Sequence, residues 1–109
     1  MKVTGLPSSF TDWSSIEPTV HPGDSGTARW WTREWGDLRI RIVEYSADYL
    51  ADHWCARGHV IHCLEGEFDV ELEDGRVFAV EAGMSCQLPE ETEPHRTRSR
   101  TGARLFIVD

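Results

Sequence analysis

The sequence predicts an all-β protein with a single domain, folded as a sandwich or a small barrel of short antiparallel strands. Its 109 residues suffice for one hydrophobic core and are too few for a second. Short runs of alternating apolar and polar residues recur along the chain, separated by turns that contain glycine or proline. No long stretch has helical spacing, and the five tryptophans suit strands better than helices.

The chain divides into an N-terminal arm and a β domain. Residues 1–26 are rich in Ser, Thr, Pro and Gly, a composition that is typical of an extended segment. We expect Phe10, Trp13 and Ile16 to dock this arm on the rest of the protein. Residues 27–109 carry the strand-like runs and are expected to form the β domain.

The first two runs of the β domain predict a hairpin. Residues 27–35 and 38–45 have high β-propensity, and only Gly36 and Asp37 separate them. A two-residue connection of this kind is typical of a tight hairpin turn. Alternation places three apolar residues of the second strand on one face, namely Leu38, Ile40 and Ile42.

A longer extended region covers residues 59–72, in which Gly66 indicates a bend or a bulge. Apolar and acidic residues alternate after this glycine, so that half of the strand has one dry face. The Asp-Gly pair at 74–75 predicts a second hairpin. A two-residue loop there would place Leu72 opposite Val77.

The last two strand-like runs indicate which of their side chains face the interior. Every second residue of the segment 95–100 is an arginine, and if the arginines face water, the alternate residues face inward, namely His95, Thr97 and Ser99. Residues 105–108 are apolar on both faces, so we expect both faces to be covered, either by the arm or by a second subunit. These features together favour a homodimer.

Four side chains of metal-ligand type lie in positions that can converge. His53 and Cys55 are two residues apart, so they share one face of an extended segment, and His59 lies an even number of residues further on. His95 begins another strand whose alternate residues face inward. The same alternation places His62 on the opposite face. The pattern makes four residues candidate ligands of one metal ion, namely His53, Cys55, His59 and His95.

These residues resemble the first motif of the cupin superfamily, GxxxxxHxHxxxxExxxxxxG. His53 stands at the first histidine, Cys55 at the second, and His59 at the glutamate. The resemblance implies a single-domain cupin, a jelly-roll barrel or double-stranded β-helix, over residues 27–109. It also implies that these positions ligate a metal.

This chain also resembles the second cupin motif, GxxxxxPxGxxH. Gly83 and Pro89 match it, and His95 takes the place of the final histidine with one extra residue in the loop. The segments ADHWC, LEDGR and AGMS are more narrowly similar to a group of small single-domain cupins named for a DHCW motif. In this sequence the order is Asp52, His53, Trp54, Cys55.

Two ligand positions depart from the cupin pattern. A thiol, Cys55, replaces an imidazole, and an imidazole, His59, replaces a carboxylate. This softer donor set favours a divalent transition metal, with zinc expected first and iron or nickel as alternatives. If all four ligands bind, the site is closed; if water takes one position, the metal can act on a substrate. Asp52 either caps a turn or orients a histidine.

Three functions are compatible with this pattern. The first is a metal-dependent enzyme, dioxygenase-like or isomerase-like, that acts on a small molecule in the barrel. The second is a non-catalytic module that binds a small ligand or senses a metal, and the third is a metal-free protein in which these side chains only pack. No catalytic residue is assigned, because Gln87 and Glu44 are the only further polar side chains that we place near the interior.

Charge and cysteine content exclude other classes. The net charge of -8 repels the phosphate backbone, so nucleic acid is not an expected partner. No run is apolar for long enough to be a signal peptide or to span a membrane. Three sparse cysteines do not support a disulfide framework. We therefore expect a cytoplasmic protein.

Overall fold

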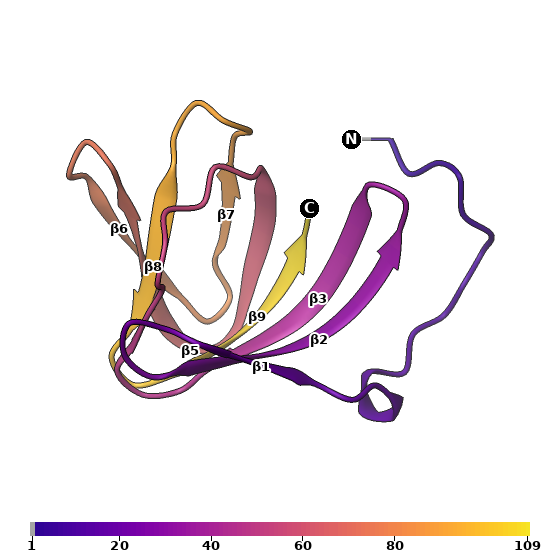
Figure 1. Cartoon of the computed structure of the whole chain (residues 1–109), viewed down its shortest axis with the longest axis horizontal. Helices are drawn as coiled ribbons and strands as arrows, with labels where there is room; N and C mark the ends of the chain where they lie inside the picture. The colour runs from indigo at the N-terminus through magenta and orange to yellow at the C-terminus, as the bar shows by residue number, and fades with distance from the viewer. Residues whose placement is uncertain (1) are drawn as a thin grey trace.

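The protein is an all-β barrel, seen in a computed structural model that describes residues 2–109. Its elements are a 3-10 turn and nine strands: η1 (Trp13–Ser15), β1 (Thr19–Pro22), β2 (Thr27–Trp35), β3 (Leu38–Tyr45), β4 (Tyr49–Leu50), β5 (His59–Leu72), β6 (Val77–Glu81), β7 (Ser85–Leu88), β8 (His95–Ser99) and β9 (Ala103–Val108). Figure 1 shows the strands curling so that β2 and β3 rise on one side and β5, β7 and β8 rise on the other. The predicted all-β fold class is confirmed.

Two antiparallel sheets share one long strand. The strand order is β1-β2-β3-β9-β5-β8-β4, and β6 and β7 also pair with β5. The first half of β5 pairs with β7 and β9, and its second half pairs with β6 and β8. Strand β5 therefore joins the two sheets, and the barrel interior lies between them.

Gly66 lies where β5 passes from one sheet to the other, next to a bulge of the kind that the sequence predicted. The pairing with β9 shifts between Cys63 and Glu65, which is a β-bulge. Before the bulge the odd-numbered side chains are buried, and after it the even-numbered ones are. Gly66 has φ 74° and lies so close to Gly102 that a Cβ would collide with the Gly102 carbonyl oxygen.

The core lies between the sheets and is made by inward residues of β3, β5 and β9. Its largest fully buried side chains are Phe68, Ile61, Leu105, Val43, Val70 and Cys63. The predicted inward face of β8 is confirmed, because His95, Thr97 and Ser99 are buried while Arg98 and Arg100 are exposed.

Both predicted hairpins form, but one has a different register. Trp35 pairs with Leu38 across Gly36-Asp37, as expected. In the second hairpin Val77 lies opposite Glu71 and not Leu72, so the predicted register is wrong by one residue. The cause is a wider turn, in which the backbone N–H of Arg76 donates to the Asp74 carboxylate.

The inner and outer faces of β3 are the reverse of what its hydrophobicity suggests. Leu38, Ile40 and Ile42 do share a face, but it is the outer one, since the alternate residues line the interior: Arg39, Arg41, Val43 and Tyr45. Glu44 therefore lies on the outer face, and Gln87 is exposed. The expectation that these two approach the interior is wrong. The apolar outer face of β3 concealed the direction of Glu44, and Gln87 of β7 pairs with Val60, which faces outward.

The N-terminal arm contributes to the sheet and covers part of its outer face. Within residues 1–26, β1 pairs with β2 as an edge strand. The ring of Trp13 packs edge-on against Phe106 of β9, with centroids 6.4 Å apart. Phe10 is 94% exposed, so the expectation that it docks the arm is wrong.

The structure also bears on membrane association. Within residues 2–109, no helix has the length and the apolar character that crossing a membrane requires.

Candidate metal centre

Three of the four predicted ligands meet at one end of the barrel. Cys55, His59 and His95 each offer a ligand atom, and these atoms all lie within 4.8 Å of one another. His59 and His95 are the first residues of β5 and β8, and both are buried. Cys55 lies in the connection before β5, where its backbone exchanges two hydrogen bonds with His95, of 2.7 and 2.9 Å. Backbone pairing therefore holds the thiol beside the imidazole of His95.

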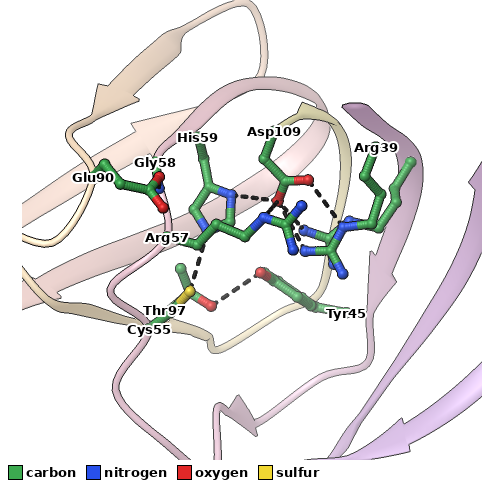
Figure 2. A network of polar contacts seen from close by, with 10 residues as sticks. Arg39, Tyr45, Cys55, Arg57, Gly58, His59, Glu90, Thr97 and Asp109 are labelled. Carbon is green, nitrogen blue, oxygen red and sulfur yellow. Dashed lines mark hydrogen bonds and ion pairs between the residues drawn. The ribbon is translucent and has the colours of Figure 1, made fainter. Parts of the chain in front are cut away.

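The imidazole of His59 connects the thiol to a carboxylate. Its Nε2 lies 3.3 Å from the sulfur of Cys55, and its Nδ1 lies 2.7 Å from Oδ2 of Asp109. Figure 2 shows Asp109 between His59 and Arg39, with Cys55 on the other side of the imidazole. A carboxylate on one ring nitrogen orients a histidine and raises the basicity of the other nitrogen.

Asp109 is the functional residue that the sequence interpretation missed. Its side chain is fully buried and receives two hydrogen bonds of 2.9 Å from Arg39 and one of 3.1 Å from Arg41. Arg57 lies 3.7 Å away. Alternation could have found it, because Asp109 continues the inward face of Leu105 and Ile107.

These contacts change the protonation of the site. The imidazoles of His59 and, to a lesser degree, His95 lower the pKa of the Cys55 thiol to about 5. Burial lowers the pKa of His59, but Asp109 and Cys55 outweigh it, so that the pKa is raised overall. Burial would raise the pKa of Asp109, but His59 and Arg39 lower it far below its usual range. The site thus favours a thiolate, the form that binds metals.

The fourth predicted ligand lies elsewhere. His53 is not among the side chains that converge; it is 74% exposed, and its Nδ1 lies 2.6 Å from Oδ1 of Asp52. Of the two roles considered for Asp52, its contact fits the orientation of a histidine. His53 does line the pocket onto which the centre opens. Its ligation of the metal stays a prediction.

The three converging side chains fit a transition metal. With bonds of about 2.3 Å to sulfur and 2.0 Å to nitrogen, tetrahedral zinc places these ligand atoms roughly 3.5 Å apart. The 3.3 Å between Cys55 and His59 is close to this value, and the ligand atom of His95 lies within 4.8 Å of both. One ring nitrogen of His95, Nδ1, is buried without a hydrogen-bond partner in residues 2–109.

The centre opens onto a pocket of about 300 Å³ inside the barrel. Its walls include the ligand residues, Trp30 and Tyr45. The hydroxyl groups of Tyr45 and Thr97 share a hydrogen bond of 2.9 Å. A pocket of this volume admits a small molecule beside the centre.

The similarity of this chain to known proteins is found by comparing structures and not by comparing sequences. No protein-family model matches the sequence, and neither does any curated protein. An RmlC-like cupin from Shewanella frigidimarina is similar with a TM-score of 0.77 and 19% identity, over 96% of this chain and 92% of its own.

Two further structures are similar over most of their length. One, from Thermotoga maritima, is described as a predicted oxalate decarboxylase and has a TM-score of 0.77 and 14% identity, over 92% of this chain and 96% of its own. The other is ectoine synthase from P. lautus, with a TM-score of 0.72 and 20% identity, over 93% of this chain and 76% of its own. The curled antiparallel sheets and these neighbours together show that the chain is a single-domain β-barrel with the fold of the cupin superfamily.

Proposed function

We propose that the protein holds a divalent transition metal on Cys55, His59 and His95 and binds a small molecule beside it. The convergence of these three ligand atoms within 4.8 Å carries the proposal. The thiolate and two imidazoles favour zinc, with iron or nickel as alternatives. When bound, the metal would supply a Lewis acid that polarises a group of the small molecule.

The number of ligands decides between an enzyme and a binding module. Three ligands leave a coordination position open for a substrate, as in catalytic zinc sites. The exposure of His53, together with the enzyme names of two structural neighbours, a predicted oxalate decarboxylase and an ectoine synthase, favours an enzyme. A dioxygenase-like or isomerase-like reaction stays a prediction. In the alternative, His53 closes the site and the protein is a non-catalytic ligand or metal sensor.

Cobalt substitution tests the metal centre. Cobalt bound to a thiolate gives an intense sulfur-to-metal absorption band, so loaded wild-type protein should show this band and Cys55→Ser should lose it. The matched control is Cys86→Ser, because Cys86 is half-buried but outside the cluster, and this variant should keep the band. Elemental analysis of protein purified without a nickel column gives the native metal.

Two outcomes would overturn the proposal. The first is a metal-to-protein ratio near zero together with a melting temperature that a chelator leaves unchanged, since a bound metal stabilises the folded state. The second is a cobalt band that survives in Cys55→Ser, because the thiolate would then lie elsewhere. A site that binds cobalt without any such band would be a histidine site that lacks Cys55.

We further propose a cytoplasmic homodimer. All three cysteines are free in the structure, which suits a reducing compartment. On the outer face of the barrel, Val108 lies opposite Ile40 on one side and Val60 on the other. Val60 is 44% exposed, so this apolar row offers a self-complementary surface to a second copy.

A further inference from the structure

The pocket beside the metal centre is rich in guanidinium groups. Arg39, Arg41 and Arg57 all line it, and they share a single side-chain carboxylate, that of Asp109. The chain as a whole carries a net charge of -8, so this concentration of positive charge is a local property of the pocket. The carboxylate of Asp109 and the thiolate of Cys55 together do not neutralise three guanidinium groups.

The three arginines differ in how many of their guanidinium N–H groups are hydrogen-bonded. Arg39 donates from Nε and from one terminal nitrogen to the two oxygens of Asp109, both at 2.9 Å, so it belongs to the frame of the site. Arg41 is only 5% exposed and reaches Asp109 through one terminal nitrogen at 3.1 Å. Its Nε is buried and has no hydrogen-bond partner in the described part of the chain.

An incompletely paired buried guanidinium is costly. A buried N–H without an acceptor loses the hydrogen bond that it makes with water in the unfolded chain. Burial lowers the pKa of Arg41, and the nearby charge of Arg39 lowers it further. Both effects reflect the cost of keeping this guanidinium charged at its buried position. An anion in the pocket beside the Arg41 guanidinium would offset this excess charge.

Arg57 lies in the connection before β5 and is available at the entrance. Its side chain is 43% exposed, and its contact with Asp109, at 3.7 Å, is the longest of the three. A side chain held this loosely can turn toward an incoming anion at little cost. Another pocket arginine, Arg96, also has a buried Nε without a partner, but Glu71 balances its charge at 3.4 Å and its guanidinium lies over the ring of Trp54.

The rest of the pocket wall is apolar and aromatic. Val43, Ile61 and Ile107 lie along it, together with Trp30, whose ring is 4.3 Å from the guanidinium carbon of Arg41. A ligand that fits this wall therefore has an apolar body as well as a negative charge.

We propose that the pocket binds a small organic carboxylate, whose charged group is held by Arg41 and Arg57 and whose apolar body contacts the wall beside Trp30. The inference rests on the proposed function in one respect, namely that the carboxylate shares the pocket with the metal centre. The arginines are not metal ligands, so their preference for a carboxylate is expected in the metal-free protein as well.

Calorimetric titration with matched acids and amides tests this proposal. Acetate, butyrate and benzoate are each compared with acetamide, butyramide and benzamide, on zinc-loaded and on metal-free protein. Because each pair differs mainly in charge, at least one carboxylate should bind about tenfold or more tightly than its amide. Arg57→Gln should reduce this preference, and so should Arg41→Lys, which keeps the charge but loses the fork of donors.

Arg98→Gln is the control, because Arg98 is 50% exposed and pairs with Asp69 away from this pocket. It should leave the preference unchanged. The proposal is overturned if no carboxylate binds, if acids and amides bind equally, or if Arg57→Gln and Arg41→Lys both keep the full preference. A preference that persists in protein unable to bind zinc would sink the metal centre and leave the carboxylate site standing.

Discussion

At the scale of single residues, the contact between Asp109 and His59 is the main addition to the metal centre. The carboxylate lies 2.7 Å from Nδ1 of the imidazole, whose Nε2 faces Cys55, and it is itself bound by Arg39. Partners of this kind affect metal affinity without touching the metal, because they set the orientation and basicity of a ligand.

We therefore expect Asp109→Asn to weaken zinc binding by about 10- to 100-fold, measured by competition with a chelator. The amide keeps the shape of the side chain but loses the negative charge that faces His59. The control is Asp37→Asn, in the exposed turn between β2 and β3, which should leave the affinity unchanged. Equal zinc affinity in the wild type and Asp109→Asn would show that the carboxylate only balances the arginines.

Tyr45 makes the stability of the barrel sensitive to high pH. Burial raises its pKa above the ordinary value of 10.0, and its ring packs between those of Tyr49 and Phe68. In the folded protein the Tyr45 phenol stays protonated above pH 10, whereas in the unfolded chain the same phenol loses its proton in this range. The stabilisation is complete below pH 10 and declines as the pH rises from there toward the folded pKa.

The free energy of unfolding should therefore fall above pH 10 by up to about 1 kcal/mol per pH unit from this group. Urea unfolding at a series of pH values measures this slope, and Tyr45→Phe should make it shallower. Tyr49→Phe is the comparison, because the pKa of this half-buried tyrosine is also raised. A slope that Tyr45→Phe does not change would assign the alkaline loss of stability to other groups, such as Cys86, whose pKa burial raises to about 11.

At the scale of elements, β5 is decisive because it belongs to both sheets. Its bulge reverses the parity of the inward side chains, so that His59 and Ile61 before it and Phe68 and Val70 after it all face the interior. Without an extra residue at this place, one half of the strand would turn its apolar side chains to solvent.

Gly66→Ala should consequently destabilise the protein by about 3 kcal/mol or more, since it combines a positive φ with a collision against Gly102. The matched control is Gly36→Ala, which has φ 55° but open space around the added methyl group, and it should cost only about 1 kcal/mol. Chemical denaturation measures both. Similar losses for the two variants would mean that the chain relaxes at Gly66 and that the bulge is not tightly constrained.

At the scale of the whole molecule, the outer face of the larger sheet is left partly uncovered by the arm. Trp13 packs on Phe106, but Val60 and Leu64 remain 44% and 41% exposed. An apolar area of this kind on both copies of a chain favours pairing about a two-fold axis.

Light scattering after gel filtration should therefore give the mass of a dimer, and Val60→Glu should shift it toward the monomer because a buried charge opposes association. Val77→Glu is the control, since Val77 is similarly exposed, at 47%, but lies on β6 in the other sheet. A monomer in the wild type, or a dimer that only Val77→Glu disrupts, would contradict the proposed interface.

Much of the fold followed from the sequence because strand periodicity and turn chemistry act locally. The inward face of β8, the Gly36-Asp37 turn and the bulge just before Gly66 depend on neighbouring residues alone, so all three could be predicted. The same alternation brought His59 and His95 to the interior. Residue types then sufficed to indicate a transition metal.

The tertiary structure decided the features that depend on more than one segment. His53 lies in an irregular connection, where alternation does not hold, and it separates from Cys55. The inward direction of Arg41 could not be read from β3, because both faces of that strand are covered and both carry apolar residues. Asp109 acquires its role only when β9 comes to lie between β3 and β5, which places one carboxylate among the arginines and beside His59. Local patterns determine which side chains share a face, but only the packing of distant strands determines what that face meets.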